Sequence, residues 1–422
     1  MKKIYLCKNC VYPNNAKPTI IFNDKQICSG CQFQMTRNDI IEQNKKKRLK
    51  LFEKIILDAK KYAKKNGNSH DCIVPISGGK DSHYQVWLLK NLYDMNPLLV
   101  HYDHLFNAHS GIANLNNLVK KSKSDLIIYR SGFDSVKKIS NAMLKKVGDI
   151  TWHYHAGIRT FPFQIACKYN IPYIFLGEHG FGELTGLISP NYIVEHTYWS
   201  RKEHDMRGLD VVDLMKIKGI NKHDLTPFIY PDESDIKKIN VRGIYMSNFF
   251  SWNYMENTKK MIKEWGFKTL TYKRDRTFNL FAKIDDHAND VHDYLKYLKF
   301  GYGRGTDDAS MEIRMGRLKR KTAINLINYY DKKTPTSLKF YCEFLGISLN
   351  KFYQIAKKLS ENHKRKNRIK IIKKRIINEE IKSNKNSIFA SKNSNFYFND
   401  FSKPKKQNDV NFDEKHDYFF GY

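Results

Sequence analysis

The chain has 422 residues and lacks any apolar run near the roughly 18 residues that cross a membrane. Its first ten residues, MKKIYLCKNC, carry charge but not the apolar stretch of a secretory signal peptide. With 41% hydrophobic residues, the chain can still bury a sizeable core. These features predict a globular protein of the cytoplasm.

Acidic residues are scarce beside basic ones, with 43 Asp and Glu against 74 Lys and Arg and a formal net charge of +31. Such an excess is typical of proteins that bind polyanions, including nucleic acids, nucleotides and membrane surfaces. A general compositional bias explains it equally well, because the chain is rich in Lys, Asn and Ile throughout. The net charge therefore leaves both interpretations open.

Cysteine is infrequent, at seven residues, but four of them form two CxxC pairs with 17 residues between the pairs. These four are Cys7, Cys10, Cys28 and Cys31. Two such pairs supply the thiolates of a closed tetrahedral zinc site. An iron–sulfur site has the same ligands, and a redox dithiol is disfavoured because neither pair is predicted to open a helix after a strand. The isolated cysteines, expected in the core, are Cys72, Cys167 and Cys342.

Short apolar strands alternate with helical patterns between residues 69 and 190. The predicted strands are 72–76, 98–103, 125–130 and 172–177, and the predicted helices between them include 82–93, 111–122 and 134–146. This alternation predicts an α/β fold with a doubly wound parallel sheet. Residues 36–68 show helical spacing, residues 191–360 read as mainly helical, and residues 361–422 form a basic low-complexity tail.

The first predicted strand ends in the SGGKDS loop, which is residues 77–82. This loop matches neither the Walker A pattern nor a dinucleotide fingerprint. Its two glycines, Gly78 and Gly79, let consecutive amides face an anion, and the helix expected to start near Ser82 adds its positive end. Ser77 and Ser82 add hydroxyl donors, and Lys80 adds a charge. Asp81 would repel phosphate unless a cation lay between them, so the loop predicts a phosphate site with Mg²⁺.

The strand, the SGGKDS loop and the following helix resemble the PP-loop of the ATP pyrophosphatase superfamily. The resemblance implies cleavage of ATP between its α and β phosphates, with Lys80 and Asp81 as catalytic residues and residues 77–82 as the ATP-binding loop. Further nucleotide contacts implied by it are His101, Asp103, Gly177 and Glu178. They follow strands at the sheet edge where ligands bind, although Asp103 and His104 could instead cap the next helix.

Several stretches, in order from about residue 5 to 345, resemble the N-acetyl sugar amidotransferases of pseudaminic acid and lipopolysaccharide biosynthesis. The stretches are CKNCVYPN with CSGC, PISGGKDSHYQ, GEHGFGE (177–183), RKEHDMRG (201–208) and KFGYGRGTDDASMEIRMGRLKR (299–320). The expected domains are a zinc-binding module (1–35), a helical connector (36–68), a PP-loop ATP-binding domain (69–235), a helical substrate region (236–360) and the tail (361–422).

The last two stretches supply the expected substrate-binding residues, which are Arg201, Arg207, Arg304, Asp307, Arg314 and Arg317. The planar fork of arginine suits the phosphates and carboxylates of sugar nucleotides. The structural alternative is a network of ion pairs within the domain.

The resemblance implies that ATP adenylates the amide oxygen of a sugar N-acetyl group. Ammonia then displaces AMP and leaves an acetamidino sugar for surface glycans or flagellin glycosylation. The chain shows no convincing Cys–His glutaminase arrangement. The resemblance therefore implies a separate glutaminase subunit (HisH-like) and a HisF-like ammonia-channel subunit, with ATP, Mg²⁺ and Zn²⁺ bound and no membrane or nucleic-acid partner.

Two alternatives remain open at this point. A tRNA-modifying enzyme for thiolation or lysidine formation would use the same ATP chemistry and would suit a net charge of +31. Thiolation needs extra active-site cysteines, for which the predicted ATP-binding domain offers only Cys72 and Cys167. A non-catalytic zinc-knuckle binding module is disfavoured by the complete SGGKDS loop.

Overall fold

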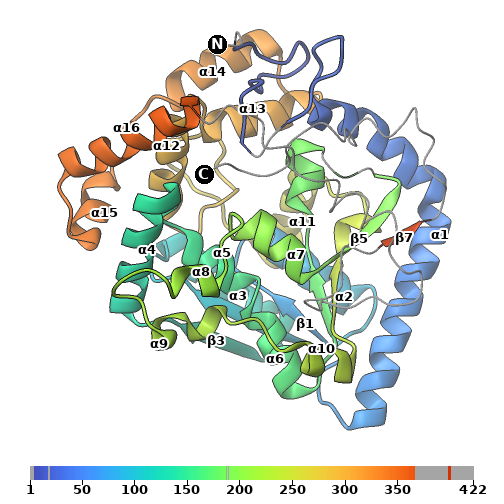
Figure 1. Cartoon of the computed structure of the whole chain (residues 1–422). Coiled ribbons are helices and arrows are strands. Elements are labelled where there is room, and N and C mark those ends of the chain that lie inside the picture. Colours follow the sequence, from blue (N-terminus) through green and yellow to red (C-terminus); the bar gives the residue numbers. More distant parts are fainter. Residues whose placement is uncertain (1–3, 18–19, 187, 189, 366–397, 401–422) are drawn as a thin grey trace.

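The computed structural model describes residues 4–17, 20–186, 188, 190–365 and 398–400 (Figure 1). Within these residues the central sheet has seven strands in the order β3-β2-β1-β4-β6-β5-β7. The strands are β1 (Cys72–Pro75), β2 (Pro97–Asp103), β3 (Leu126–Arg130), β4 (Tyr173–Leu176), β5 (Tyr192–His196), β6 (Arg242–Tyr245) and β7 (Phe398–Asp400). The run from β3 to β6 is parallel, and β5 is antiparallel to both of its neighbours. The prediction of an α/β fold with a mainly parallel sheet is confirmed.

The four predicted strands correspond to β1, β2, β3 and β4, each within one residue at either end. Strands β5 and β6 lie in the region expected to be mainly helical, so the sheet extends past the boundary predicted at residue 235. Both strands are short, and each carries a charged residue. Buried Glu195 of β5 pairs with Arg242 of β6 at 2.6 Å. A buried ion pair hides the apolar pattern by which a strand is usually predicted.

Helices in the first half of the chain cover both faces of the sheet (Figure 1). They are α1 (Ser29–Asn66), α2 (Lys80–Asn91), α3 (His109–Ser122), α4 (Phe133–Val147), α5 (Trp152–Ile158), α6 (Phe161–Tyr169), α7 (Tyr198–Ser200), α8 (Val211–Leu214), α9 (Lys222–Leu225) and α10 (Glu233–Ile239). Two short π-helices are η1 (Phe181–Thr185) and η2 (Arg201–Asp205). In β1 the side chain of Val74 packs on one face with α1 and α2, and that of Ile73 packs on the other with α6.

The second half of the chain adds a helical region beside the carboxyl edge of the sheet. Its helices are α11 (Tyr254–Trp265), α12 (Ala288–Phe300), α13 (Arg304–Arg314), α14 (Arg320–Tyr330), α15 (Leu338–Leu345) and α16 (Leu349–Arg365). The 3₁₀ turns are η3 (Thr226–Phe228) and η4 (Met246–Asn248). Helices α12, α15 and α16 share a hydrophobic cluster with α4. Apart from the end of α16 and β7, the predicted tail lies outside the described residues.

Helix α1 spans 38 residues and differs from the prediction at its start. Cys28 directly precedes the helix and Cys31 lies in its first turn, so the second CxxC pair opens a helix, although no strand among the described residues comes before it. The helix ends at Gly67, whose φ of 66° and backbone bonds to Ala63 and Lys64 close its last turn. None of the helices in the described ranges is long and apolar enough to cross a membrane.

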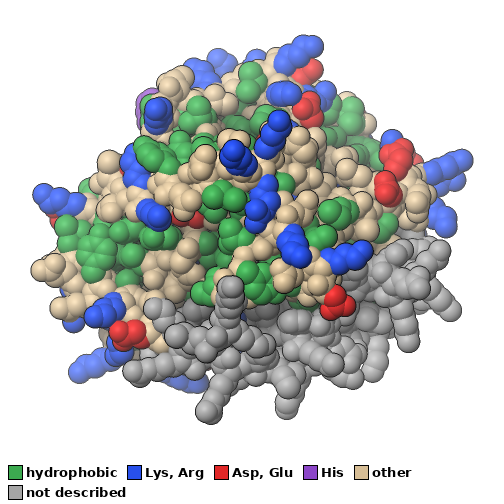
Figure 2. Space-filling view, turned by 90° about the horizontal axis from the view of Figure 1, so that it is seen from above, with side chains coloured by type: hydrophobic (Ala, Val, Ile, Leu, Met, Phe, Trp, Pro, Cys, Tyr) green, Lys and Arg blue, Asp and Glu red, His purple; other side chains and the backbone are tan. Residues whose placement is uncertain are grey.

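Basic side chains are spread over the face seen in Figure 2 and alternate there with apolar and uncharged groups. The net charge of the chain is thus seen on this face as many separate basic side chains among other groups.

Candidate functional site

The SGGKDS loop connects the carboxyl end of β1 to the first turn of α2. Helix α2 begins at Lys80, two residues earlier than predicted, and Gly79 precedes it as an extended residue. The backbone N–H of Ser77 donates to the Ser82 hydroxyl at 3.0 Å, and the N–H of Gly79 donates to the Ser77 hydroxyl at 3.2 Å. These bonds fold the loop over the start of the helix, where the first amides have no acceptor within the helix. Such a site fits the phosphates of ATP.

Gly78 has a clear steric reason to be glycine. Its φ is 85°, and a Cβ atom there would lie 2.8 Å from the backbone nitrogen of Leu115 and 2.9 Å from the carbonyl oxygen of Gly111. The loop thus approaches the backbone of α3 too closely for any side chain.

The other predicted nucleotide-binding residues lie at the same edge of the sheet. His101 and Asp103 end β2, and Gly177 and Glu178 follow β4 directly. Because β1 pairs in parallel with both strands, all three chain segments leave the sheet side by side. The structure therefore brings these residues together with the SGGKDS loop, while their binding roles stay predictions.

Asp103 does not cap the next helix, because α3 begins only at His109 and Ala108 precedes it. Its carboxylate instead accepts bonds from the N–H of Leu105 at 2.9 Å, from Asn107 at 2.7 Å and from Arg130 at 2.7 Å. Burial raises the pKa of this carboxyl, but these hydrogen bonds outweigh burial and lower it overall. The charged Asp103 organises the turn after β2.

Charges of both signs meet beside the loop. Lys80 forms an ion pair with Asp81, and the indole N–H of Trp252 donates to the other oxygen of Asp81 at 3.3 Å. Burial lowers the pKa of Lys80, but Asp81, Glu178 and Asp308 raise it overall. Burial and the charge of Asp81 raise the pKa of Glu178 to about 7. The two carboxyl groups repel each other, and a divalent cation between them would relieve that repulsion.

Helix α13 brings the late charged stretch to this edge. Asp308 acts electrostatically on Lys80, and the Lys80 ammonium lies 5.7 Å from the ring centre of Tyr254. Arg317 lies 4.9 Å from the centre of the same ring and binds Glu312 with two bonds of 2.7 and 3.2 Å. The predicted substrate residue Arg317 is thus linked to Lys80 through one tyrosine.

Two further predicted substrate residues pair with neighbours at the start of α13. Arg304 binds both oxygens of Asp293, at 2.9 and 3.1 Å, and Asp307 accepts two bonds from Lys296, at 2.9 and 2.7 Å. Because Arg304 is partly exposed, its remaining N–H groups can still contact a ligand.

The other three predicted substrate arginines lie apart from the loop. Arg201 is fully buried, binds Asp210 at 3.2 Å and stacks 4.6 Å from the ring centre of Tyr230. Arg207 binds Asp149 at 3.0 Å. Arg314 lies against the cysteines. These contacts are those of structural ion pairs, and no contact to a substrate tests the predicted roles.

The four cysteines of the CxxC pairs converge in one buried cluster. Their sulfur atoms all lie within 4.8 Å of one another, with Cys7 and Cys31 at 3.9 Å and Cys10 and Cys28 at 3.6 Å. Tetrahedral zinc with Zn–S bonds of about 2.3 Å holds its sulfurs about 3.8 Å apart. Four buried cysteines at this spacing can hold a metal ion such as zinc.

Arginines from the late stretch surround this cysteine cluster. The Arg314 guanidinium lies 3.5 Å from the sulfur of Cys28 and donates to the carbonyl of Leu184 at 2.7 Å. Arg320 donates to the backbone carbonyls of Cys7 and Cys10 at 3.3 and 3.0 Å. The cluster therefore joins the N-terminal module to α13 and to the segment that follows Glu178.

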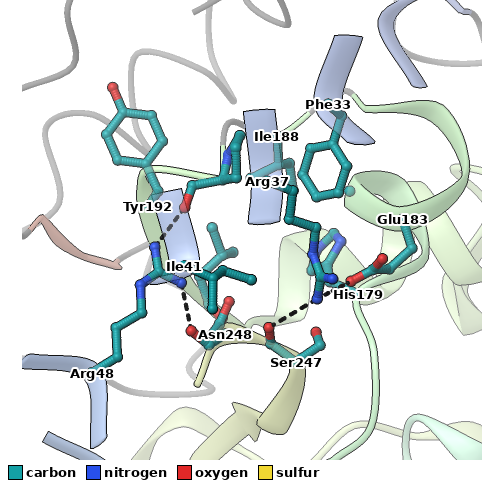
Figure 3. A pocket seen from close by; sticks show the side chains of 13 residues that line it. Phe33, Arg37, Ile41, Arg48, His179, Glu183, Ile188, Tyr192, Ser247 and Asn248 are labelled. Carbon is teal, nitrogen blue, oxygen red and sulfur yellow. Dashed lines mark hydrogen bonds and ion pairs between the residues drawn. The ribbon is translucent and has the colours of Figure 1, made fainter. Parts of the chain in front are cut away.

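A pocket between α1 and the segments after β4 and β6 contains residues not singled out from the sequence (Figure 3). In it Arg37 binds Glu183 at 3.0 Å and the carbonyl of Ser247 at 3.3 Å, and Arg48 donates to the carbonyls of Pro190 and Asn248. Burial raises the pKa of Glu183, and the charge of Asp81 raises it further. Glu183 belongs to the stretch GEHGFGE. Arg37 lies in a helix rich in charged residues, and no motif near it in the sequence marks it as a pocket residue.

The helical region has a known counterpart. Residues 275–376 match the family described as the C-terminal domain of WbpG-like LPS biosynthesis proteins. This match supports the expected similarity to lipopolysaccharide enzymes of the WbpG type. It indicates a role in sugar or lipopolysaccharide biosynthesis, and therefore an enzyme.

A second comparison concerns a shorter part of the chain. The uncharacterized protein MJ1599 of Methanocaldococcus jannaschii is 31% identical over 137 residues. The match covers 31% of this chain and 47% of that protein, so the chain spans about half the length of this relative.

Proposed function

We propose that the protein is an ATP-dependent N-acetyl sugar amidotransferase that forms AMP and pyrophosphate. The observation that carries the proposal is the joining of two features at one sheet edge. Lys80 of the SGGKDS loop lies 5.7 Å from the ring centre of Tyr254, whose hydroxyl donates to Glu312 of α13. Helix α13 belongs to the region that matches WbpG-like proteins of LPS biosynthesis. An enzyme that activates a sugar with ATP requires a phosphate-binding loop beside a region of the kind found in sugar-biosynthesis proteins.

In this proposal the loop amides, the two serines and Lys80 bind the phosphates of ATP. Asp81 and Glu178 would hold Mg²⁺, which would neutralise the charge of the departing pyrophosphate. The ends of β2 and β4 would hold the nucleoside at the same edge. The chain itself would mainly position ATP and the sugar and stabilise the charge that develops on the phosphates.

A sugar acetamide is a poor electrophile, and transfer of AMP to its carbonyl oxygen would activate the carbon. The nitrogen of ammonia then bonds to that carbon, the C–O bond breaks, and AMP leaves with the oxygen. The product is an acetamidino sugar, with the protons lost by nitrogen passed to water or a nearby base. Because ammonia is free in this scheme, a glutaminase partner would supply it in the cell.

The cysteine cluster would bind zinc in a structural role. Four thiolates leave no open coordination position, and the cluster is buried against Arg314. We therefore assign it to holding α13 and the segment after β4 in place.

The deciding experiment compares nucleotide-sugar pools by mass spectrometry in the parent strain and a deletion strain. We expect loss of an acetamidino sugar and accumulation of its N-acetyl precursor, which is about 1 Da heavier because O replaces NH. The proposal fails if the sugar pool is unchanged while modified tRNA nucleosides disappear.

A further inference from the structure

The pocket between α1 and η1 has no role in the reaction proposed above (Figure 3). It contains a cavity of about 40 Å³. Since one bound water needs roughly 10–15 Å³ of such a cavity, a few molecules of the size of water or ammonia fit in it. A sugar or a nucleotide is too large. The size of the cavity therefore restricts its ligand to a very small molecule.

The cavity borders the carboxyl end of β4 along two segments of the chain. Its lining residue His179 directly follows Glu178, and the N–H of Ser247, another lining residue, donates to the carbonyl of Gly177 at 3.1 Å. Burial and the charge of Asp81 raise the pKa of Glu178, and the charge of the lining residue Glu183 adds to them. A molecule in the cavity would thus lie next to the residues proposed to hold ATP and Mg²⁺.

Apolar side chains form a large part of the cavity wall. They include Phe33 and Ile41 of α1 and Val194 of β5. Apolar groups cannot replace the hydration of a cation, so the transfer of ammonium from water to this wall costs much free energy. Neutral ammonia loses far less hydration. The wall therefore favours NH₃ over NH₄⁺.

The charged side chains at the cavity favour the same ligand. Burial and then the charge of Arg37 lower the pKa of Arg48 to about 10, so a further cation beside these two guanidinium groups would be repelled. Both groups already donate to oxygen atoms of the protein, which weakens their attraction for an anion. Glu183 binds Arg37 through one oxygen, and its other oxygen can accept an N–H of ammonia.

We propose that this cavity binds neutral ammonia and delivers it to the activated sugar. The inference rests on the proposed function, in which ammonia is the nucleophile, and it adds the place where that nucleophile is held. Ile41 and Gly182 would set the size of the amine that is accepted, and Arg37 and Arg48 would exclude its charged form. A glutaminase partner would then have to release ammonia toward α1 and η1.

Two glycines of the same stretch give a matched test that fills the cavity. A Cβ atom at Gly182, which lines it, would lie 3.5 Å from the ring of Phe33, an ordinary contact, whereas a Cβ atom at exposed Gly180 would meet no atom within 4 Å. The assay supplies ATP, ammonium chloride and the N-acetyl sugar that accumulates in the deletion strain. We expect Gly182→Val to raise the KM for ammonium at least about tenfold without changing the KM for ATP, and Gly180→Val to behave like the parent protein.

Two neighbouring isoleucines give the opposite test, which enlarges the cavity. Ile41 lines it, whereas Ile40 is buried to the same degree but is not one of its lining residues. Methylamine is larger than ammonia by one methyl group. We expect Ile41→Ala to form an N-methylacetamidino sugar from methylamine, identified by mass spectrometry, and Ile40→Ala and the parent protein to form none.

The outcomes separate this inference from the proposed function. If the parent protein makes the acetamidino sugar but Gly182→Val and Gly180→Val have the same KM for ammonium, the inference is overturned alone. Equal use of methylamine by Ile41→Ala and Ile40→Ala overturns it too, and this comparison decides the matter if Gly182→Val does not fold. A parent protein that makes no acetamidino sugar at saturating ammonium overturns the proposed function and this inference together.

Discussion

Asp81 is a partly exposed carboxylate between a lysine and an indole N–H, at the start of α2. We expect Asp81→Ala to lose at least about 100-fold in ATP-dependent pyrophosphate release, because the proposed Mg²⁺ ligand is gone. Asp134→Ala is a matched control, since Asp134 stands in the first turn of α4, after β3. Full activity in Asp81→Ala would refute the role given to Asp81.

Glu178 gives the site a pH dependence with a definite sign. Its pKa is raised to about 7, mainly by burial and then by Asp81, so the ionised fraction rises about tenfold between pH 6 and pH 8. The Mg²⁺ concentration for half-maximal pyrophosphate release should therefore fall as the pH rises. Glu178→Gln should need more Mg²⁺ and lose most of this pH dependence; an unaltered pH profile would exclude Glu178 as the titrating group.

Arg314 connects helix α13 to the cysteine cluster. Cys10→Ser should remove the bound metal, measured by mass spectrometry of metal content, and lower the melting temperature. Cys167→Ser is the control, because Cys167 is half-buried and lies outside the cluster. Retention of one metal per chain in Cys10→Ser would contradict a four-cysteine site.

Arg314→Lys tests the link between the cluster and the segment after β4. Lysine cannot reproduce the fork that contacts both the Cys28 sulfur and the Leu184 carbonyl. We expect a loss of about 1–3 kcal/mol in the free energy of unfolding and faster metal release to a chromogenic chelator. If only sugar binding weakens while metal release is unchanged, Arg314 is a substrate residue, as the sequence alone predicted.

The sequence predicted the elements whose signals are local. Strands β1 to β4 are apolar runs, and the SGGKDS loop and the CxxC pairs are contiguous motifs. Strands β5 and β6 were missed because Glu195 and Arg242 carry charges that only their pairing explains. The contact of Arg314 with cysteines nearly 300 residues away leaves no local trace in the sequence, which predicts only a substrate contact for this residue.

Among the residues that the structure describes, none of the isolated cysteines is suited to glutamine hydrolysis. Cys72 and Cys342 are buried, and burial with the charge of Asp235 raises the pKa of Cys167 to about 12. We expect the purified chain to release AMP with ammonium chloride but not with glutamine. Glutamate formed from glutamine by the isolated chain would contradict this prediction.

Helix α1 has a consequence for how the protein is made. The ring centre of its Phe52 lies 5.1 Å from that of Tyr93, which is made soon after α1, and 5.0 Å from that of Phe249, which is made much later. The apolar face of α1 is therefore covered only in part, by β1 and α2, until about residue 250 has emerged from the ribosome. During this interval the nascent chain still offers the rest of this face to chaperones.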